Sequence, residues 1–279
     1  MRAEFSATRW ERAYRRVVST AFRRVPFYRD QWVAAGRALD EPEPTPSAAL
    51  TGQLFRLCPF ALPFDPSREP SLWTGDGSDL RDALALAGVP RRTPVLEVRA
   101  AVLDRRTLAA PPFAWRGPRY GVLLGPDAKV VDESRRHALN AAALRLAAEA
   151  GRAVVVGERA ALDAVLPELT GVRVSVVERL SLAQAAKVGD APVRAGDAAV
   201  VHDPRLGYLA SVVPGCGRTH LLWRHFHARP AGGTLTFTAL RRRRPMLVNV
   251  VPDDPGTPAI AVCPEHGTPT VSTPARTPA

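Results

Sequence analysis

The stretch "DESRRHALNAAALRLAAEAGRAVVVGERAALDAVLPELTGVRVSVV", residues 132–177, contains the alternation that decides the fold. Its first part is rich in alanine and leucine, with Asp132 placed to cap a helix and Gly151 placed to end it. A short apolar run, a second helical pattern and a second apolar run follow, over 152–157, 158–169 and 172–177. Strand, helix and strand at this spacing predict a parallel sheet with covering helices.

The residues on the N-terminal side extend this pattern. Two runs, "TPVLEVRAAVL" and "YGVLLG", have the composition of strands and would add to the same sheet. Further upstream, an apolar stripe with arginines on the opposite face predicts an amphipathic helix over 9–25: Trp10, Ala13, Tyr14, Val17, Val18, Ala21, Phe22 and Val25. Pro26 ends this helix, and Gly36 closes a short second one. We expect the stripe to dock on the α/β body.

Composition and proline content divide the chain into segments. These are an N-terminal helical segment (1–37), a proline-rich linker extended over a surface (38–70), an α/β region (71–197), a β-rich region (198–270) and a disordered tail (271–279). The predicted fold class is therefore α/β, with a helical N-terminus, a parallel α/β middle and a β-rich C-terminal third.

The net charge of +11 comes almost entirely from arginine, because Lys129 and Lys187 are the only lysines among 38 basic residues. One interpretation is the coding bias of a GC-rich genome, such as an actinobacterial one. The other is an acidic partner: a nucleic acid, a phosphorylated cofactor such as CoA, or an acyl carrier protein. Aromatic residues make up 6% and no nucleic-acid motif is present, which disfavours nucleic acid. The "RRRR" at 241–244 is expected to be a solvated turn.

Several classes of protein have no support in the sequence. We find no apolar run long enough for a membrane span, no signal peptide, and only three cysteines at long spacing, so we expect a cytoplasmic protein without a disulfide framework. Motifs for a phosphate-binding P-loop, a nucleophile elbow, a zinc protease or a C-x-x-C pair are also absent.

Two pairs of residues have the spacing of zinc ligands. Cys216 and His220 are spaced C-x3-H, Cys263 and His266 are spaced C-x2-H, and glycines beside each pair allow tight turns. The sequence therefore predicts one structural zinc held by these four side chains. The alternative is reduced cysteines and surface histidines without a metal. Two further histidines, His225 and His227, are expected on a solvent-facing strand edge, and Cys58 is expected to be a buried thiol.

Four blocks of the chain resemble one enzyme family. They are "AYRRVVSTAFRRVPFYRDQWVAAG", "AVVVGERAALDAVLPEL", "VVHDPRLGYLASVVPGCGRTH" and "LTFTALRRRRPMLVNVVPDD". Together they resemble the phenylacetate–CoA ligase-like branch of the adenylate-forming (AMP-binding) superfamily. The resemblance implies cofactor-binding roles for Tyr208 and for Asp253, the acidic residue at the ribose position, although a solvated turn explains Asp253 and Asp254 equally well. It also implies zinc, because zinc-bearing members carry a Cys and a Gly-x-His pair at the equivalent place.

The departures from that family limit what the resemblance implies. The Ser/Thr/Gly-rich phosphate loop ending in lysine is missing, no lysine follows residue 250, and the family's Thr-Glu is His202-Asp203 here. Phosphoryl-transfer chemistry needs such preorganised cations, so we expect a degenerate relative without its own ATP machinery. It would bind or transfer an acyl or aromatic-acid group, as a CoA or carrier thioester, beside an acyl carrier protein or a ligase partner in bacterial specialised metabolism.

Two other functions remain open. His202 and Asp203 are the candidate catalytic pair of an enzyme of another class, acting as acid and base in a cleft, although Asp203 can equally start the turn "DPRLG". The second alternative is a basic nucleic-acid-binding regulator.

Overall fold

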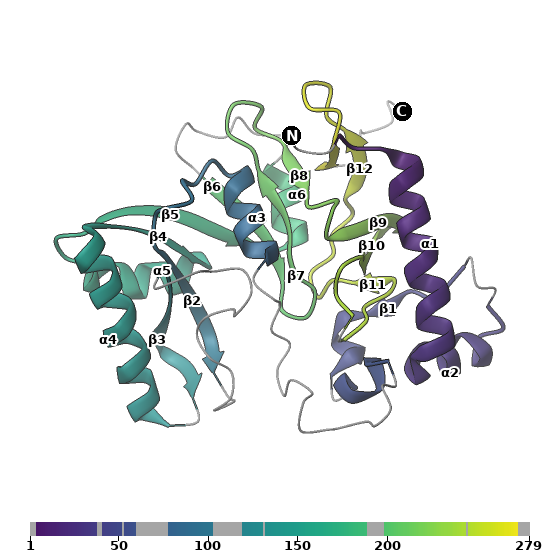
Figure 1. Cartoon of the computed structure of the whole chain (residues 1–279), viewed down its shortest axis with the longest axis horizontal. Coiled ribbons are helices and arrows are strands. Elements are labelled where there is room, and N and C mark those ends of the chain that lie inside the picture. Colours follow the sequence, from purple (N-terminus) through teal and green to yellow (C-terminus); the bar gives the residue numbers. More distant parts are fainter. Residues whose placement is uncertain are drawn as a thin grey trace.

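The computed structural model describes residues 4–37, 41–51, 53–59, 78–102, 119–130, 132–188, 198–243 and 245–272 (Figure 1). The α-helices are α1 (Ala7–Arg24), α2 (Pro26–Ala34), α3 (Ser78–Leu86), α4 (Glu133–Ala150), α5 (Arg159–Val165) and α6 (Leu182–Val188). The short 3-10 helices are η1 (Ser47–Leu50), η2 (Leu54–Leu57) and η4 (Leu166–Glu168). The strands are β1 (Thr45–Pro46), β2 (Val95–Val102), β3 (Tyr120–Val130), β4 (Arg152–Gly157), β5 (Arg173–Leu180), β6 (Ala198–Asp203), β7 (Gly207–Val212), β8 (Thr219–Leu221), β9 (Phe226–Ala231), β10 (Thr234–Ala239), β11 (Val250–Val251), β12 (Ala259–Val262) and β13 (Pro269–Ser272).

The larger sheet has nine strands in the order β12-β13-β8-β7-β6-β5-β4-β2-β3. The strands from β3 to β6 are parallel to one another, and β7, β8, β13 and β12 continue the sheet in antiparallel pairing. This mixed α/β fold, with helices at the N-terminus and strands in the C-terminal part, confirms the predicted fold class.

Helix α4 forms where the sequence pattern places it. The Asp132 side chain accepts a hydrogen bond from the backbone N–H of Ser134 at 2.7 Å, and Gly151 ends the helix in the left-handed region at φ +62°. Helices α4 and α5 cover one face of the parallel strands. The buried cluster on that face is Leu96, Val98, Leu123, Ala143, Ala147, Ala153, Val155, Leu162, Val165 and Leu169.

The smaller sheet has the order β1-β11-β10-β9, and the N-terminal helices pack against it at the end of the molecule away from α4 (Figure 1). The indole N–H of Trp10 donates to the Phe226 carbonyl of β9 at 2.9 Å, and Tyr28 donates to the Met246 carbonyl at 3.1 Å. The apolar stripe of α1 therefore docks on this second sheet. Our expectation that it docks on the parallel α/β body was wrong, because its polar partners come from strands that follow residue 220.

Parts of the predicted linker and tail are packed structure. Within 38–70, β1 pairs with β11, and Leu50 and Leu57 are fully buried. In the segment predicted to be a disordered tail, Val271 is 2% exposed and pairs with β8, so the disorder prediction fails at least through Ser272. Residues 273–279 lie outside the described residues. The sequence of this segment gave no sign of a strand, because β13 forms by pairing with β8, about fifty residues earlier in the chain.

The boundary predicted at residue 197 does not separate two sheets. Strand β6 pairs in parallel with β5 across it, and β7 then continues the same sheet. Two helices, α3 and α6, were not anticipated from the sequence. Arg242, in the predicted solvated turn, is largely buried and donates to the carbonyls of Arg205 and Leu206 at 2.9 Å.

Candidate functional site

A cleft of about 750 Å³ opens at the carboxyl ends of the parallel strands. Strands β2, β5 and β6 contribute residues to its lining, and so does the segment that directly follows β4, at Glu158 and Arg159. The chain reverses its strand order between β2 and β4, and ligands of open α/β sheets bind at such a reversal. The predicted catalytic and cofactor residues all line this cleft: His202, Asp203, Tyr208 and Asp253.

The floor of the cleft is a buried charge network centred on Glu97 of β2. Its carboxylate accepts hydrogen bonds from Arg99 at 3.0 and 3.1 Å, from Arg179 of β5 at 3.0 Å, and from the Tyr208 hydroxyl at 2.7 Å. The hydroxyl of Tyr120 also donates to it. Two guanidinium groups thus share one carboxylate in a place where isolated charges would be strongly disfavoured.

Burial and neighbouring charges set the protonation of this network. Burial alone would raise the pKa of Glu97, but the charges of Arg99 and Arg179 outweigh it and hold that pKa well below its usual range. Burial, with the nearby Glu97 charge, raises the pKa of Tyr208 well above its usual range. The network therefore contains an ionised carboxylate, two cations and neutral tyrosines at any physiological pH.

His202 lies in this cleft beside the network. Its ring centroid is 4.6 Å from that of Tyr208. Burial, followed by the positive charge of Arg179, lowers the pKa of His202 to about 3. At neutral pH His202 is thus an uncharged imidazole.

The Asp203 carboxylate accepts hydrogen bonds from backbone N–H groups and from a serine, and His202 is not among these donors. One carboxylate oxygen accepts from the backbone N–H groups of Arg205 and Leu206 at 2.8 Å and from Ser47 at 3.1 Å, and the other accepts from the N–H of Asp253 at 3.0 Å. These bonds hold the turn after β6, as the sequence "DPRLG" allows. The structure thus brings His202 and Asp203 to one cleft but gives their side chains separate partners.

The other two predicted residues also have partners. The Tyr208 hydroxyl accepts from Arg179 at 2.7 Å while donating to Glu97, and the Asp253 carboxylate pairs with Arg205 at 2.8 Å. The sequence analysis missed Glu97, Arg99 and Arg179. A signal was present for the first two, because charged residues stand among apolar ones in a run predicted to be a strand.

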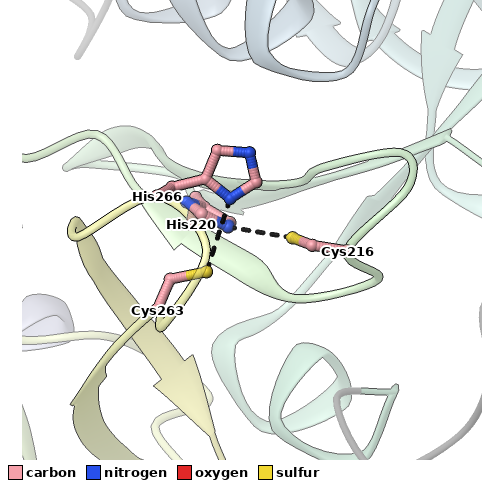
Figure 2. Close-up of side chains that lie close together, drawn as sticks. All are labelled: Cys216, His220, Cys263 and His266. Atoms are coloured by element: carbon pink, nitrogen blue, oxygen red, sulfur yellow. Dashed lines mark hydrogen bonds between the residues drawn. The ribbon is translucent and has the colours of Figure 1, made fainter.

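The four predicted zinc ligands form a second site (Figure 2). Their donor atoms all lie within 4.8 Å of one another, which places each within 4 Å of a common point. The Cys216 sulfur is 3.1 Å from Nε2 of His220, and the Cys263 sulfur is 3.4 Å from Nδ1 of His266. Zinc–ligand bonds of about 2.0–2.3 Å in a tetrahedron give similar spacings. The predicted convergence of these side chains is confirmed.

Two turns bring the ligands together. Cys216 lies in the β7–β8 turn and His220 on β8, while Cys263 and His266 lie in the β12–β13 turn, as Figure 2 shows. Gly217 and Gly267 take φ values of +64° and +62°, which other residues rarely adopt. Both turns are held because β13 pairs with β8 and with β12.

The donor set suits zinc. His220 uses Nε2 toward the cluster, while its Nδ1 lies 2.9 Å from the Thr268 hydroxyl, the kind of outer contact that orients a metal-binding imidazole. Burial, with the charge of His266, lowers the pKa of His220 to about 4, so this ring is neutral and able to bind a metal at physiological pH. The thiols and imidazoles would supply a complete set of four ligands.

His225 and His227 are not on a solvent-facing edge, and that prediction was wrong. His225 lies in a turn with Nε2 2.8 Å from the Asp82 carboxylate, and His227 is 5% exposed between the rings of Trp10 and Tyr14. The local sequence pattern predicted that this strand face is exposed to solvent. In the structure, helix α1 covers it. Cys58 is buried, as expected.

The metal cluster and the cleft lie at opposite ends of β7. This six-residue strand begins at Gly207 in the cleft and ends before the turn that contains Cys216. Its length is roughly 20 Å. A metal at the cluster would therefore support the sheet without reaching a ligand in the cleft.

In the part of the chain that the structure describes, no helix combines the length and the hydropathy needed to cross a membrane. No protein family and no curated protein matches the sequence. A solved structure does match: a 2-hydroxyisobutyryl-CoA ligase in the postadenylation state, in complex with 2-HIB-AMP. The match has a TM-score of 0.54 and 13% identity, and covers 96% of this chain and 67% of the ligase chain. At that identity the likeness concerns the fold alone: this chain has the fold of an adenylate-forming acyl-CoA ligase.

Proposed function

We propose that this protein is a degenerate relative of the adenylate-forming ligases that binds an acyl or aromatic-acid group in the cleft. The group would arrive as a free acid or as a CoA or carrier thioester. The protein would hold or pass on the group without activating it with ATP. The setting would be the specialised metabolism of a bacterium, and the nearest family branch would be the phenylacetate–CoA ligases.

The observation that carries this proposal is the cleft itself. It lies at the strand ends where such folds bind ligands, it has the volume of a small-molecule site, and its walls combine apolar residues with a few buried polar groups. Leu80, Leu180 and Leu182 supply apolar wall, while Arg99 and Arg179 supply buried cations. An acid of modest size would find both kinds of surface there.

The same cleft has few of the groups that bind and activate ATP. The sequence has no Ser/Thr/Gly-rich phosphate loop, and neither Lys129 on β3 nor Lys187 on α6 lines the cleft. Carboxylates outnumber cations among the lining side chains. A triphosphate needs the reverse arrangement, because its charge must be neutralised as the reaction proceeds.

Two measurements test the proposal together. We expect no acid-dependent ATP–pyrophosphate exchange above a control without protein, and we expect calorimetry to detect binding of carboxylic acids or their CoA thioesters to the full chain. A Gly207→Trp variant should abolish that binding, since Gly207 lines the cleft and a side chain there would meet Asp79. Exchange with any acid, or no binding of acids and thioesters, would overturn the proposal.

We also propose that Cys216, His220, Cys263 and His266 hold one structural zinc ion. The convergence of four soft or borderline donors supports this, and the contact between His220 and Thr268 supports it independently. When bound, zinc would cross-link the β7–β8 and β12–β13 turns.

A further inference from the structure

The two thiols of the metal cluster differ in how well solvent reaches them. Cys216 is partly exposed in the β7–β8 turn, whereas Cys263 is fully buried in the β12–β13 turn. Oxidation of a cysteine depends on its exposure, so an oxidant dissolved in water reaches the Cys216 sulfur first. The Cys263 sulfur is shielded by the protein around it.

The two sulfurs are close enough to be joined, although they come from different turns (Figure 2). All four donor atoms of the cluster lie within 4.8 Å of one another, so the Cys216 and Cys263 sulfurs are separated by at most that distance. A disulfide bond is about 2.05 Å long, so the two sulfurs have to approach each other by less than about 3 Å. Cys58, the third cysteine of the chain, is outside the cluster.

The turn that contains Cys216 has room for this movement. Gly215 and Gly217 flank Cys216, with φ values of +94° and +64°. Among the described residues, no atom lies within 4 Å of a Cβ placed on Gly215, so the space beside this turn is open. Because glycine adopts a wide range of backbone conformations, a small rearrangement of this turn can bring the Cys216 sulfur to Cys263.

We propose that the cluster is a peroxide-sensitive zinc site, in which oxidation joins Cys216 to Cys263 and releases the metal ion. The inference rests on the zinc ion of the proposed function and goes beyond it, because it gives two of the four ligands a redox role. Zinc binds cysteine as the thiolate, which a disulfide no longer offers. Only His220 and His266 would remain, too few ligands for a structural zinc site.

The reaction has two steps, and hydrogen peroxide is the oxidant. In the first, the Cys216 thiolate attacks one peroxide oxygen, the O–O bond breaks, and the other oxygen leaves as hydroxide. In the second, the Cys263 thiolate attacks the sulfenic sulfur of Cys216, the S–S bond forms, the S–O bond breaks, and a second hydroxide leaves. Each hydroxide takes up a proton to become water. The two sulfurs together lose two electrons, and the peroxide gains them.

The fold is expected to survive this reaction. The disulfide would link the same two turns that the zinc ion links, and the pairing of β13 with β8 lies outside both turns. The oxidised protein should therefore stay folded without its metal. Dithiothreitol should then restore the two thiols, because it reduces a disulfide by thiol–disulfide exchange and is itself oxidised to a cyclic disulfide.

Peroxide titration of the zinc-loaded full chain tests the inference. A zinc-sensitive dye measures the released metal, and mass spectrometry of the digested protein locates the disulfide. We expect about one zinc ion to be released per peroxide consumed, together with a Cys216–Cys263 cross-link that dithiothreitol removes. The matched control is Cys58→Ala, which should behave as the wild type because Cys58 is outside the cluster.

Two single variants test the order of attack. In Cys263→Ser the second thiol is missing, so we expect the sulfenic acid of Cys216 to accumulate and to be trapped by dimedone, a reagent specific for sulfenic acids. In Cys216→Ser the remaining thiol is the shielded one, so dimedone labelling should be at least about tenfold lower. Each variant loses one zinc ligand, so the two are matched. Equal labelling would overturn the assignment of Cys216 as the attacking thiol.

Three further outcomes count against the inference. If peroxide leaves the zinc bound, or releases it without joining Cys216 to Cys263, the inference is wrong and the proposed zinc ion still stands. If the cross-link involves Cys58, the assignment of the pair is wrong. If the chain contains no zinc before peroxide is added, the zinc proposal and this inference fail together.

Discussion

At the scale of single residues, the metal cluster depends on two thiols in different surroundings. Cys263 is fully buried in its turn, whereas Cys216 is partly exposed in the opposite one. Both turns are rich in residues that favour turns. A metal would therefore supply a cross-link that the local sequence does not provide.

We expect the purified protein to contain about one zinc per chain, and Cys216→Ser to lose it, because the variant leaves three of four ligands. Cys58→Ala is the matched control, since Cys58 is outside the cluster. His225→Gln should also keep its zinc. Metal analysis of the dialysed proteins measures the content; zinc retained at full occupancy by Cys216→Ser would refute the ligand assignment.

A second residue prediction concerns acid. Burial lowers the pKa of His227 to about 4, against a partly compensating attraction from Glu11 at 3.2 Å. An unfolded histidine titrates near 6.5, so the unfolded chain takes up the proton first as pH falls. The contribution of neutral His227 to stability is fully present above about pH 6.5 and is lost as pH falls toward 4, by about 3 kcal/mol.

A His227→Phe variant keeps an aromatic ring between Trp10 and Tyr14 but cannot titrate. Urea unfolding at pH 7.5 and at pH 4.5 should show a smaller loss of unfolding free energy for the variant than for the wild type. Glu11 and Arg229 face the same ring, and the variant retains both, so the difference isolates the imidazole. Equal losses in the two proteins would show that His227 does not titrate in this window.

The residues of the candidate sites were predictable to different degrees. The zinc ligands are close pairs in the sequence with glycines beside them, so local spacing was enough to find them. Glu97 and Arg99 were visible only as charges inside a strand. The partner of both, Arg179, lies on a strand eighty residues later, and only the parallel sheet brings them together.

At the scale of single elements, β13 links the two halves of the metal cluster. It lies between β12 and β8, and Thr270 and Val271 are buried there. A chain ending at residue 268 keeps all four ligand residues but loses this strand. We expect that truncation to lower the melting temperature and to lose zinc, because the β12–β13 turn is no longer fixed against β8.

The control for this truncation ends at Ser272. It keeps β13 whole and should melt and bind zinc as the full chain does. Thermal denaturation and metal analysis of the two truncated proteins make the comparison. An unchanged melting temperature and zinc content in the shorter protein would mean that β13 contributes nothing to either.

The elements that could be predicted are those whose signals are local. Helix α4 has a capping residue, a long run of helix formers and a closing glycine within one stretch. Helix α3 is short, and its buried Asp79 accepts from the N–H of Tyr208, a contact 129 residues away. Strand β1 has two residues and exists only through β11. No local pattern specifies either element.

At the scale of the whole molecule, the N-terminal helices complete the smaller sheet. Tyr14, Tyr28 and Trp32 are each at most 2% exposed against it. Burying such a side chain contributes roughly 1.5–3 kcal/mol, and three of them approach the total stability of a domain, about 5–15 kcal/mol. We expect deletion of residues 1–36 to give unfolded or aggregated protein.

A milder variant keeps the test informative if the deletion cannot be purified. Tyr28 donates to Met246 and accepts from the N–H of Val248 at 2.8 Å. Tyr28→Phe removes both bonds without removing the ring and should cost about 1–3 kcal/mol in urea unfolding. A soluble deletion protein with an unchanged melting temperature would refute the docking of the helices.

The distance along the chain between α1 and its partners has a consequence for synthesis. The Tyr14 hydroxyl donates to Asn249, which lies 235 residues later. At about 5–20 residues per second, a ribosome needs roughly 10–50 s to make that stretch. Once α1 has left the exit tunnel, its aromatic face has no strand to cover it for the rest of this interval. The nascent chain therefore offers a hydrophobic helix to chaperones for most of its translation.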